Sequence, residues 1–251
     1  MEEINLNQFI REIKINRNKI VNNDIYPFSL PIIKELSSLK LHPGVTFIVG
    51  ENGSGKSTLL EAIAISYGFN PEGGTKNFNF STYNSHSLLY KYIHIIKGIK
   101  NPKDGFFLRA ESMYNLASNI DELDGYNGIG KKLIDSYGGR SLHEQSHGES
   151  FLSIMINRFS KNGLYILDEP EAALSPTRQM SMITRIHDLV NENCQFIIST
   201  HSPILMSYPN CIIYEIKNGR LKETKLEDTE HYQITKSFLE NKNKFLDILL
   251  K

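Results

Sequence analysis

The nine residues GENGSGKST, positions 50–58, constrain the fold of this chain more than any other stretch. They follow a short apolar run, residues 45–49 (VTFIV), which predicts a buried strand. Apolar residues at helical spacing follow over 57–66 and predict a helix. In this context the nine residues match G-x-x-x-x-G-K-[ST], whose backbone N–H groups and following helix N-terminus stabilise bound phosphate. The sequence therefore predicts a nucleotide site at this turn.

Lys56 and Ser57 are the two functional side chains of this loop. The glycines let the backbone curl so that successive N–H groups face inward. We expect Lys56 to reach the β- and γ-phosphates and the Ser57 hydroxyl to ligate Mg²⁺, so ATP and Mg²⁺ are the predicted cofactors. The expected nucleotide-binding residues are Gly50, Glu51, Asn52, Gly53, Ser54, Gly55, Lys56, Ser57 and Thr58.

Strand and helix patterns alternate along the rest of the chain, which predicts an α/β fold with a mainly parallel sheet. Further strands are expected at 105–110, 164–170 and 195–200, and helices at 148–160, at 176–191 after a Ser175 cap, and from 229 onward. Residues 90–99 fit a helix or a strand, and 112–137 alternate helical pieces with glycine breaks. The runs CIIYEI and RLKETKL flank Lys217-Asn218-Gly219 and predict a hairpin.

Two carboxylates close the apolar strand LYIL. Because Asp168 and Glu169 end a buried strand, they are expected at the carboxyl edge of the sheet, where the phosphate loop must also lie. We expect Asp168 to hold Mg²⁺ and Glu169 to polarise the attacking water. His201, in STHSP, follows the next strand and is expected to reach the γ-phosphate. The predicted catalytic residues are therefore Glu169, His201 and Lys56.

The stretch SLHEQSHGES, residues 141–150, supports two interpretations. Ser146 and Glu149 have the S-x-x-E spacing of a capping box, which predicts a helix that begins at 146–147 and whose N-terminal amides can face an anion. Alternatively, His143 and His147 fit H-E-x-x-H, the zinc-protease helix motif. That alternative needs one continuous helix and a third protein ligand. Gly148 and the new helix cap at Ser146 argue against the zinc motif, whereas a second capping box, Ser141 with Glu144, leaves the zinc alternative open.

Composition narrows the class of protein only modestly. The 28 basic and 28 acidic residues balance, so the net charge gives no support to the hypothesis that this protein coats nucleic acid. A local basic groove is compatible with this zero net charge. Cys194 and Cys211 are expected to be reduced core residues, as in the cytosol. No apolar run reaches the ~20 residues of a membrane span, and the first residues lack a signal-peptide core. A cytoplasmic protein without its own transmembrane segment is therefore expected.

The order of these motifs resembles that of the ATP-binding-cassette (ABC) ATPase superfamily. The matching segments are GENGSGKS (Walker A), SHGES (signature), LYILDE (Walker B), AALSP (D-loop) and the switch histidine His201. The resemblance implies a sandwich homodimer that binds each ATP between one copy's phosphate loop and the partner's signature, Ser146, His147, Gly148 and Glu149, with Ser175 in the D-loop. It also implies a single domain over 1–251, with a small helical insert at roughly 84–147.

The resemblance is incomplete at several positions. His147 replaces the first glycine of the usual signature, and no Q-loop glutamine is evident; Glu111, after FFLRA, is the candidate for that place and for a third metal ligand. Tyr26 and Phe28 are candidates for the aromatic ring that stacks on adenine, although aromatic residues at such positions are more often part of the core. Transport ATPases more often carry Asp where this chain has Ser175 and Ser202. The chain thus resembles the soluble branch, which includes RecF-like, SMC-like and OLD-like ATPases.

These resemblances lead to three functional hypotheses. The first is an ATPase that acts on nucleic acid or a partner protein, in repair or defence. The second is the ATP-binding subunit of a membrane transporter. The third is a nucleotide-gated regulatory module with little turnover.

Overall fold

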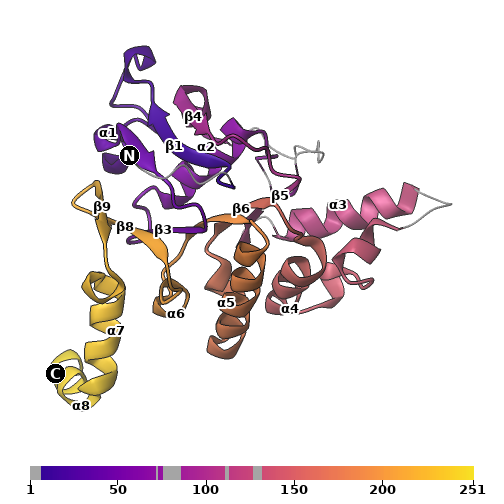
Figure 1. Cartoon of the computed structure of the whole chain (residues 1–251). Helices are drawn as coiled ribbons and strands as arrows, with labels where there is room; N and C mark the ends of the chain where they lie inside the picture. The colour runs from indigo at the N-terminus through magenta and orange to yellow at the C-terminus, as the bar shows by residue number, and fades with distance from the viewer. Residues whose placement is uncertain (1–6, 72, 76–85, 111–112, 127–131) are drawn as a thin grey trace.

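The computed structural model describes residues 7–71, 73–75, 86–110, 113–126 and 132–251 of the chain. Two sheets lie above a layer of helices, and a pair of C-terminal helices projects away from them (Figure 1). One sheet has six strands, and the other has three. The prediction of an α/β fold with a mainly parallel central sheet is confirmed.

Each strand predicted from a buried apolar run is present in the six-stranded sheet. In the order of the sheet, its strands are β5 (Asp104–Arg109), β6 (Gly163–Asp168), β7 (Gln195–Ser199), β3 (Val45–Val49), β8 (Cys211–Lys217) and β9 (Arg220–Thr224). The first four strands in this order pair in parallel with their neighbours, and β8 also pairs in parallel with β3. β9 pairs antiparallel with β8, so the hairpin prediction is confirmed.

The three-stranded antiparallel sheet was not predicted from the sequence. It consists of β1 (Ile10–Ile15), β2 (Ser38–Lys40) and β4 (Ile93–Lys97). β4 lies within the segment that fitted either a helix or a strand, so that ambiguity is resolved as a strand. β2 has only three residues, and β1 pairs with partners that are distant in the sequence. Pairing between such distant short segments leaves little periodic signal in the sequence.

The central sheet separates two apolar cores because successive side chains of a strand point to opposite faces. In β6, Leu164 and Ile166 belong to the core that includes α2 (Lys56–Tyr67) and the three-stranded sheet. Tyr165 and Leu167 belong to the core on the other face. That second core is formed with α3 (Met113–Tyr126), α4 (His147–Ser153), the π-helix at Ile154–Arg158, α5 (Pro176–Asn191) and α6 (Pro203–Met206).

The remaining helices are short or lie at the chain's C-terminal end. α1 (Pro31–Glu35) packs beside the phosphate-loop side of the fold, and α7 (Glu230–Glu240) and α8 (Lys242–Leu249) form the projecting pair. Within the predicted insert, roughly 84–147, β4 and β5 belong to the sheets, so its described α-helical part begins at Met113. Short 3₁₀ helices lie at Arg17–Lys19, Leu88–Tyr92, Leu133–Tyr137, Leu142–Glu144, Pro170–Ala173 and Leu226–Asp228.

Among the described residues, no helix combines the length and the apolar character that crossing a bilayer requires. Both cysteines are free thiols: Cys194 is buried and Cys211 is half-buried. Burial raises the pKa of each thiol to about 11, so both stay protonated near neutral pH.

The buried side chain of Gln195 joins the two sheets. Its Oε1 accepts hydrogen bonds from the N–H groups of Phe9 and Ile10 at 3.0 and 2.9 Å. Its Nε2 donates to the carbonyls of Ile10 and His42 at 2.8 and 2.9 Å. One side chain thus satisfies four backbone groups next to a fully buried strand.

Gln195→Ala is therefore expected to lower the free energy of unfolding by about 2–4 kcal/mol, because it leaves buried backbone groups without partners. Urea unfolding followed by circular dichroism measures this loss. Asn191→Ala, at an exposed position near the end of α5, is the matched control and should change stability by less than about 0.5 kcal/mol. Equal stabilities of the two variants would contradict the role of Gln195.

Candidate functional site

The phosphate loop runs from the end of β3 into α2. Gly53 and Gly55 have φ values of 77° and 98°, in the left-handed region that glycine adopts without steric cost. At Gly55 a Cβ atom would lie 2.7 Å from Cγ2 of Ile32, so α1 packs directly against the loop. This packing and the two glycine conformations give the loop the tight curl that the sequence predicted.

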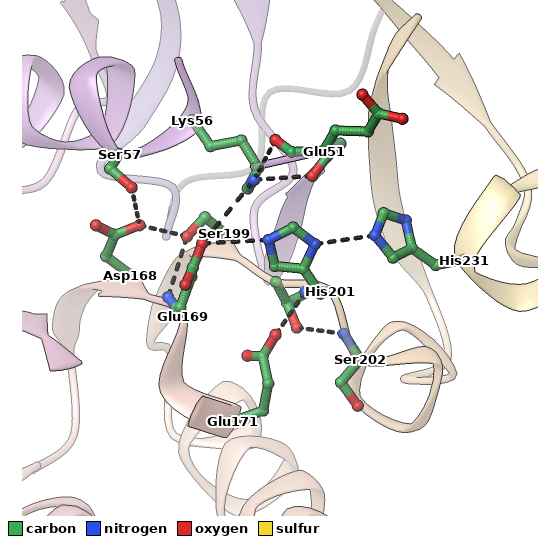
Figure 2. Close-up of polar contacts among 12 residues, drawn as sticks. Glu51, Lys56, Ser57, Asp168, Glu169, Glu171, Ser199, His201, Ser202 and His231 are labelled. Atoms are coloured by element: carbon green, nitrogen blue, oxygen red, sulfur yellow. Dashed lines mark hydrogen bonds and ion pairs between the residues drawn. The ribbon is translucent and has the colours of Figure 1, made fainter. Parts of the chain in front are cut away.

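Lys56 folds back across the loop. Its Nζ donates to the carbonyl oxygens of Gly50 and Glu51 at 2.8 and 2.9 Å, and it lies 3.9 Å from Oε1 of Glu169 (Figure 2). The side chain is only 3% exposed. Burial lowers the pKa of Lys56, while Glu169, Asp168 and Glu171 oppose that shift. The Lys56 ammonium thus lies at the centre of the loop, in contact with two backbone carbonyls and opposite the Glu169 carboxylate.

Asp168 ends β6 within reach of three elements. Its Oδ1 accepts from Ser57 at 3.1 Å and from Ser199 at 2.5 Å, and Oδ2 lies 3.6 Å from Nε of Arg109. The sheet register causes two of these contacts, because Asp168 is paired with Arg109 on β5 and with Ser199 on β7. Burial raises the pKa of Asp168, and the Ser199 hydrogen bond and Arg109 oppose the rise.

Glu169 and His201 face each other beside Lys56. Glu169 has a φ of 49° and a ψ of 53°, a left-handed conformation that a non-glycine residue rarely adopts, and its N–H donates to Ser199. Its Oε1 lies 3.2 Å from Nε2 of His201. In Figure 2, dashed lines join the Glu169 carboxylate to the His201 imidazole and to the Lys56 ammonium. Lys56, Asp168, Glu169 and His201 thus meet where β3, β6 and β7 end.

Four residues of this site were not predicted from the sequence. Ser199 and Arg109 contact Asp168, the Glu171 carboxylate accepts from the His201 N–H, and His231 contacts the His201 ring. Ser199 and Arg109 both stand at strand ends, which is the signal that could have found them. Arg109 also pairs with Glu61 of α2 at 2.7 Å. His231 lies on α7, and nothing in the sequence links it to His201.

The signature segment begins a helix as the capping box predicted. The Ser146 hydroxyl accepts from the Glu149 N–H, and the Glu149 side chain accepts from the Ser146 N–H. Arg178 of α5 pairs with Glu149 at 3.1 Å and also reaches Ser146. Ser175 caps α5 by accepting from the Arg178 N–H. A groove beside these residues is lined by Ala110, Met113, Ser146, Gly148, Phe151, Pro170, Ala172, Ser175 and Arg178.

The zinc interpretation of this stretch is wrong. His143 lies in the 3₁₀ helix Leu142–Glu144, the backbone is extended at Gln145, and a new helix begins at His147. The continuous helix that H-E-x-x-H requires is therefore absent. The His143 ring contacts Ser118 at 3.0 Å and lies edge-on to Tyr114. In the part of the chain that the structure describes, no group of three His, Cys, Asp or Glu residues could hold a metal ion.

Three further predicted residues have different outcomes. Phe28 is 4% exposed and packs edge-on against Tyr92, so the core alternative holds for this residue and it is not the adenine-stacking ring. Tyr26 is 61% exposed and its hydroxyl lies 3.2 Å from the Thr58 hydroxyl, so it stays a candidate. Glu111 lies outside the described residues.

Two family models match the chain. The model described as "ABC transporter" matches residues 35–172, which is more than half of the 251 residues. The model described as "AAA ATPase domain" matches residues 144–206. The first match includes the phosphate loop, the signature and the two carboxylates, and the second includes His201.

Curated relatives and solved structures agree with these matches. The lipoprotein-releasing system ATP-binding protein LolD of Buchnera aphidicola is 28% identical over 82% of this chain and 94% of its own. The cobalt import ATP-binding protein CbiO of Salmonella typhimurium is 27% identical over 76% of this chain and 74% of its own.

Two solved structures share the fold. The ADP conformation of MJ1267, an ATP-binding cassette of an ABC transporter, superposes with a TM-score of 0.53 at 18% identity, over 91% of this chain and 98% of that one. A nucleotide-free ATP-binding cassette from an ABC transporter gives 0.50 at 16% identity, over 81% and 88%. At these identities the likeness establishes the α/β fold.

Proposed function

This chain belongs to the ABC transporter family of ATPases, and on that premise we propose that it is the ATP-binding subunit of a membrane transporter. In this proposal two copies bind two ATP molecules between them, and hydrolysis works on a membrane partner. The curated relatives named above are ATP-binding proteins of a lipoprotein-releasing system and of cobalt import, which supports transport over work on nucleic acid. The subunit would face the cytoplasm.

The convergence of Lys56, Asp168, Glu169 and His201 is the observation that carries the ATPase proposal. Lys56 binds the β- and γ-phosphates, for which it exchanges the loop carbonyls that it now contacts. Ser57 and Asp168 fit Mg²⁺, because a hydroxyl and a carboxylate 3.1 Å apart are oxygen ligands of the kind this ion prefers. When bound, the ion would neutralise charge on the phosphates.

Glu169 and His201 supply the hydrolytic groups in this proposal. The Glu169 carboxylate is 35% exposed, so water can reach it, and it orients the water that attacks the γ-phosphate. Nε2 of His201 now faces Glu169, and when this nitrogen carries the hydrogen it donates to a γ-phosphate oxygen. Catalysis then rests mainly on positioning and on stabilising charge.

The position of the signature supports a site made by two copies. α2, which follows the phosphate loop, belongs to the core on one face of the central sheet, whereas α4, which begins at the signature, belongs to the core on the other face. Ser146 and Glu149 direct their polar groups to each other and to Arg178. Because Ser146 and Glu149 are both exposed, the start of α4 is available to complete a nucleotide site on a second copy.

The two serines that favoured the soluble branch do not argue against transport. Ser175 is the N-cap of α5, and Ser202 is the N-cap of α6, where its hydroxyl accepts from the Leu205 N–H at 3.2 Å. Ser and Asp are almost equally favourable at an N-cap, so either residue performs this structural task. The match of the AAA ATPase domain model to residues 144–206 does not distinguish the two roles, so the nucleic-acid hypothesis is kept as the second candidate for the test below.

A mixing experiment tests the shared site. Lys56→Ala removes the phosphate-binding lysine, and Ser146→Arg blocks the signature, so each variant alone should be inactive. Mixed in equal amounts, they should recover about a quarter of wild-type ATP turnover, since random pairing makes half of the dimers mixed and gives those one complete site. Ser181→Arg, on the exposed surface of α5, is the control and should keep full activity.

Activity that stays at the level of the separate variants after mixing would contradict a site made by two copies. The membrane role needs a different measurement, in which ATP turnover is compared with added DNA, with RNA and with a detergent extract of the native membranes. Stimulation by the extract alone, lost after its proteolysis, is expected. Stimulation by DNA or RNA alone would favour the second candidate.

A further inference from the structure

His231, at the start of the projecting helix pair, contacts the switch histidine His201 on the side of the ring opposite Glu169. Its Nε2 lies 2.9 Å from Nδ1 of His201, and the two ring centroids are 5.0 Å apart. The opposite nitrogen of His201, Nε2, faces Glu169 at 3.2 Å. Figure 2 shows the His201 ring between the Glu169 carboxylate and His231. A residue more than 25 positions beyond the last sequence motif therefore contacts the catalytic site.

The hydrogen-bond partners assign the protons of this pair. An ionised Glu169 only accepts, so Nε2 of His201 carries the hydrogen that points toward it. In a neutral His201, Nδ1 is then an acceptor, and His231 must donate its Nε2–H to it. Burial first, then His201 and Lys56, lower the pKa of His231, which favours its neutral form. Nδ1 of His231 has no hydrogen-bond partner among the described residues, so His201 is the polar contact that orients its ring.

Two buried groups fix the helix that carries His231. Thr229 is fully buried and caps α7 by accepting from the Tyr232 N–H. Glu215 of β8 is 3% exposed and accepts from the Glu230 N–H at 2.8 Å. β8 pairs with β3, the strand that leads into the phosphate loop. The first turn of α7 is thus held to the central sheet at the point where His231 meets His201.

We propose that His231 is a positioning residue of the ATPase site, which donates its Nε2–H to His201 and so keeps His201 presenting an N–H, and not a bare nitrogen, to the γ-phosphate. The inference rests on the proposed role of His201 and extends it to the C-terminal helices. Without this donor, the other neutral tautomer of His201 becomes accessible, and its unprotonated Nε2 would meet phosphate oxygens with a lone pair.

The helices α7 and α8, here called the C-terminal arm, project from the fold and have no buried residues of their own. His231 is half-buried and lies where the C-terminal arm joins the sheet. A movement of α7 that withdraws His231 would therefore loosen His201 without any change in the phosphate loop. Through the hydrogen bond between the two histidines, the position of the C-terminal arm would affect the rate of ATP hydrolysis.

A double-mutant cycle of His201 and His231 tests the proposal in the full chain. His231→Phe keeps a ring of similar size without the donor and should lower kcat about 10- to 100-fold, the effect of a misplaced group, with a KM for ATP within about twofold of wild type. In a His201→Ala background, the same substitution should change kcat by less than about twofold, because the histidine that it positions is gone.

His231→Gln places an amide N–H near the position of Nε2–H and should restore kcat to within about threefold of wild type, since the donor is kept. Gln233→Ala, two residues farther along α7, is the matched control and should leave kcat unchanged. Thermal unfolding of every variant separates a folding defect from a catalytic one.

Three outcomes would overturn the inference. The first is a wild-type kcat for His231→Phe. The second is a His231→Phe effect that is equally large with and without His201, which indicates a structural role. The third is a His201→Ala protein that hydrolyses ATP like wild type, which would also remove the proposed role of His201. If Glu169→Gln is inactive while His231→Phe is fully active, the proposed function stands and this inference fails.

Discussion

Lys56→Ala is expected to raise the dissociation constant for Mg²⁺–ATP at least 100-fold, because it removes the hydrogen bonds of a cation to the phosphates. The lysine is the one cation that the described structure puts inside the loop, 3% exposed and directed across it. The remaining loop N–H groups supply only dipoles. Calorimetric titration of ATP into the purified variant measures the change.

A control is needed because Lys56 also closes the loop. Removal of its ammonium leaves the carbonyls of Gly50 and Glu51 without this donor, so weak binding could arise from a distorted loop. Lys56→Arg keeps the charge but not the compact shape, and Lys34→Ala removes an exposed lysine of α1. Lys34→Ala should bind like wild type, and Lys56→Arg should bind more weakly than wild type while it stays folded. Wild-type affinity in Lys56→Ala would remove the central claim about the loop.

Glu169→Gln is expected to leave ATP affinity nearly unchanged and to slow turnover by about 10²–10⁴-fold, the range typical of a lost general base. Its carboxylate lies 3.9 Å from Lys56 and 3.2 Å from His201, at the end of β6. The amide keeps the size of the side chain and can still contact the His201 ring. It cannot take a proton from water, so binding and hydrolysis should separate.

Single-turnover measurements of phosphate release test this separation without interference from product release. Glu192→Gln, which changes an exposed acid at the end of α5, should hydrolyse ATP at the wild-type rate. A Glu169→Gln protein with wild-type turnover would assign the base to another residue. If it instead loses ATP binding, then the 3.9 Å contact with Lys56 stabilises the loop and Glu169 is not a purely catalytic group.

Local signals in the sequence were sufficient for several elements of the site. Each rests on residues that are neighbours in the chain: the glycines before α2, the apolar run that ends at Asp168, and the S-x-x-E box at Ser146. The structure has a strand, a loop and a helix at the first, a buried strand at the second and a capped helix at the third. Such features are predictable because a hydrogen-bonded cap or a buried strand places its requirement on consecutive residues.

Contacts between segments that are distant in the chain could not be predicted from local sequence patterns. The sequence left Phe28 open as a core residue or an adenine-stacking ring, and only its packing against Tyr92 showed that it belongs to the core. The three-stranded sheet depends on pairing between β1 and two segments that lie far from it in the chain. Arg109 and Ser199 reach Asp168 only because of the sheet register.

Neighbouring residues were enough to predict the phosphate loop, the two carboxylates at the end of a buried strand and the serine caps of α4 and α5, because each of these features is encoded within a few consecutive residues. Which strands pair, which face of the sheet α4 covers and the contact of His231 with His201 became known only from the folded chain. These contacts depend on how segments distant in the chain pack together, and such packing leaves no periodic pattern in the sequence.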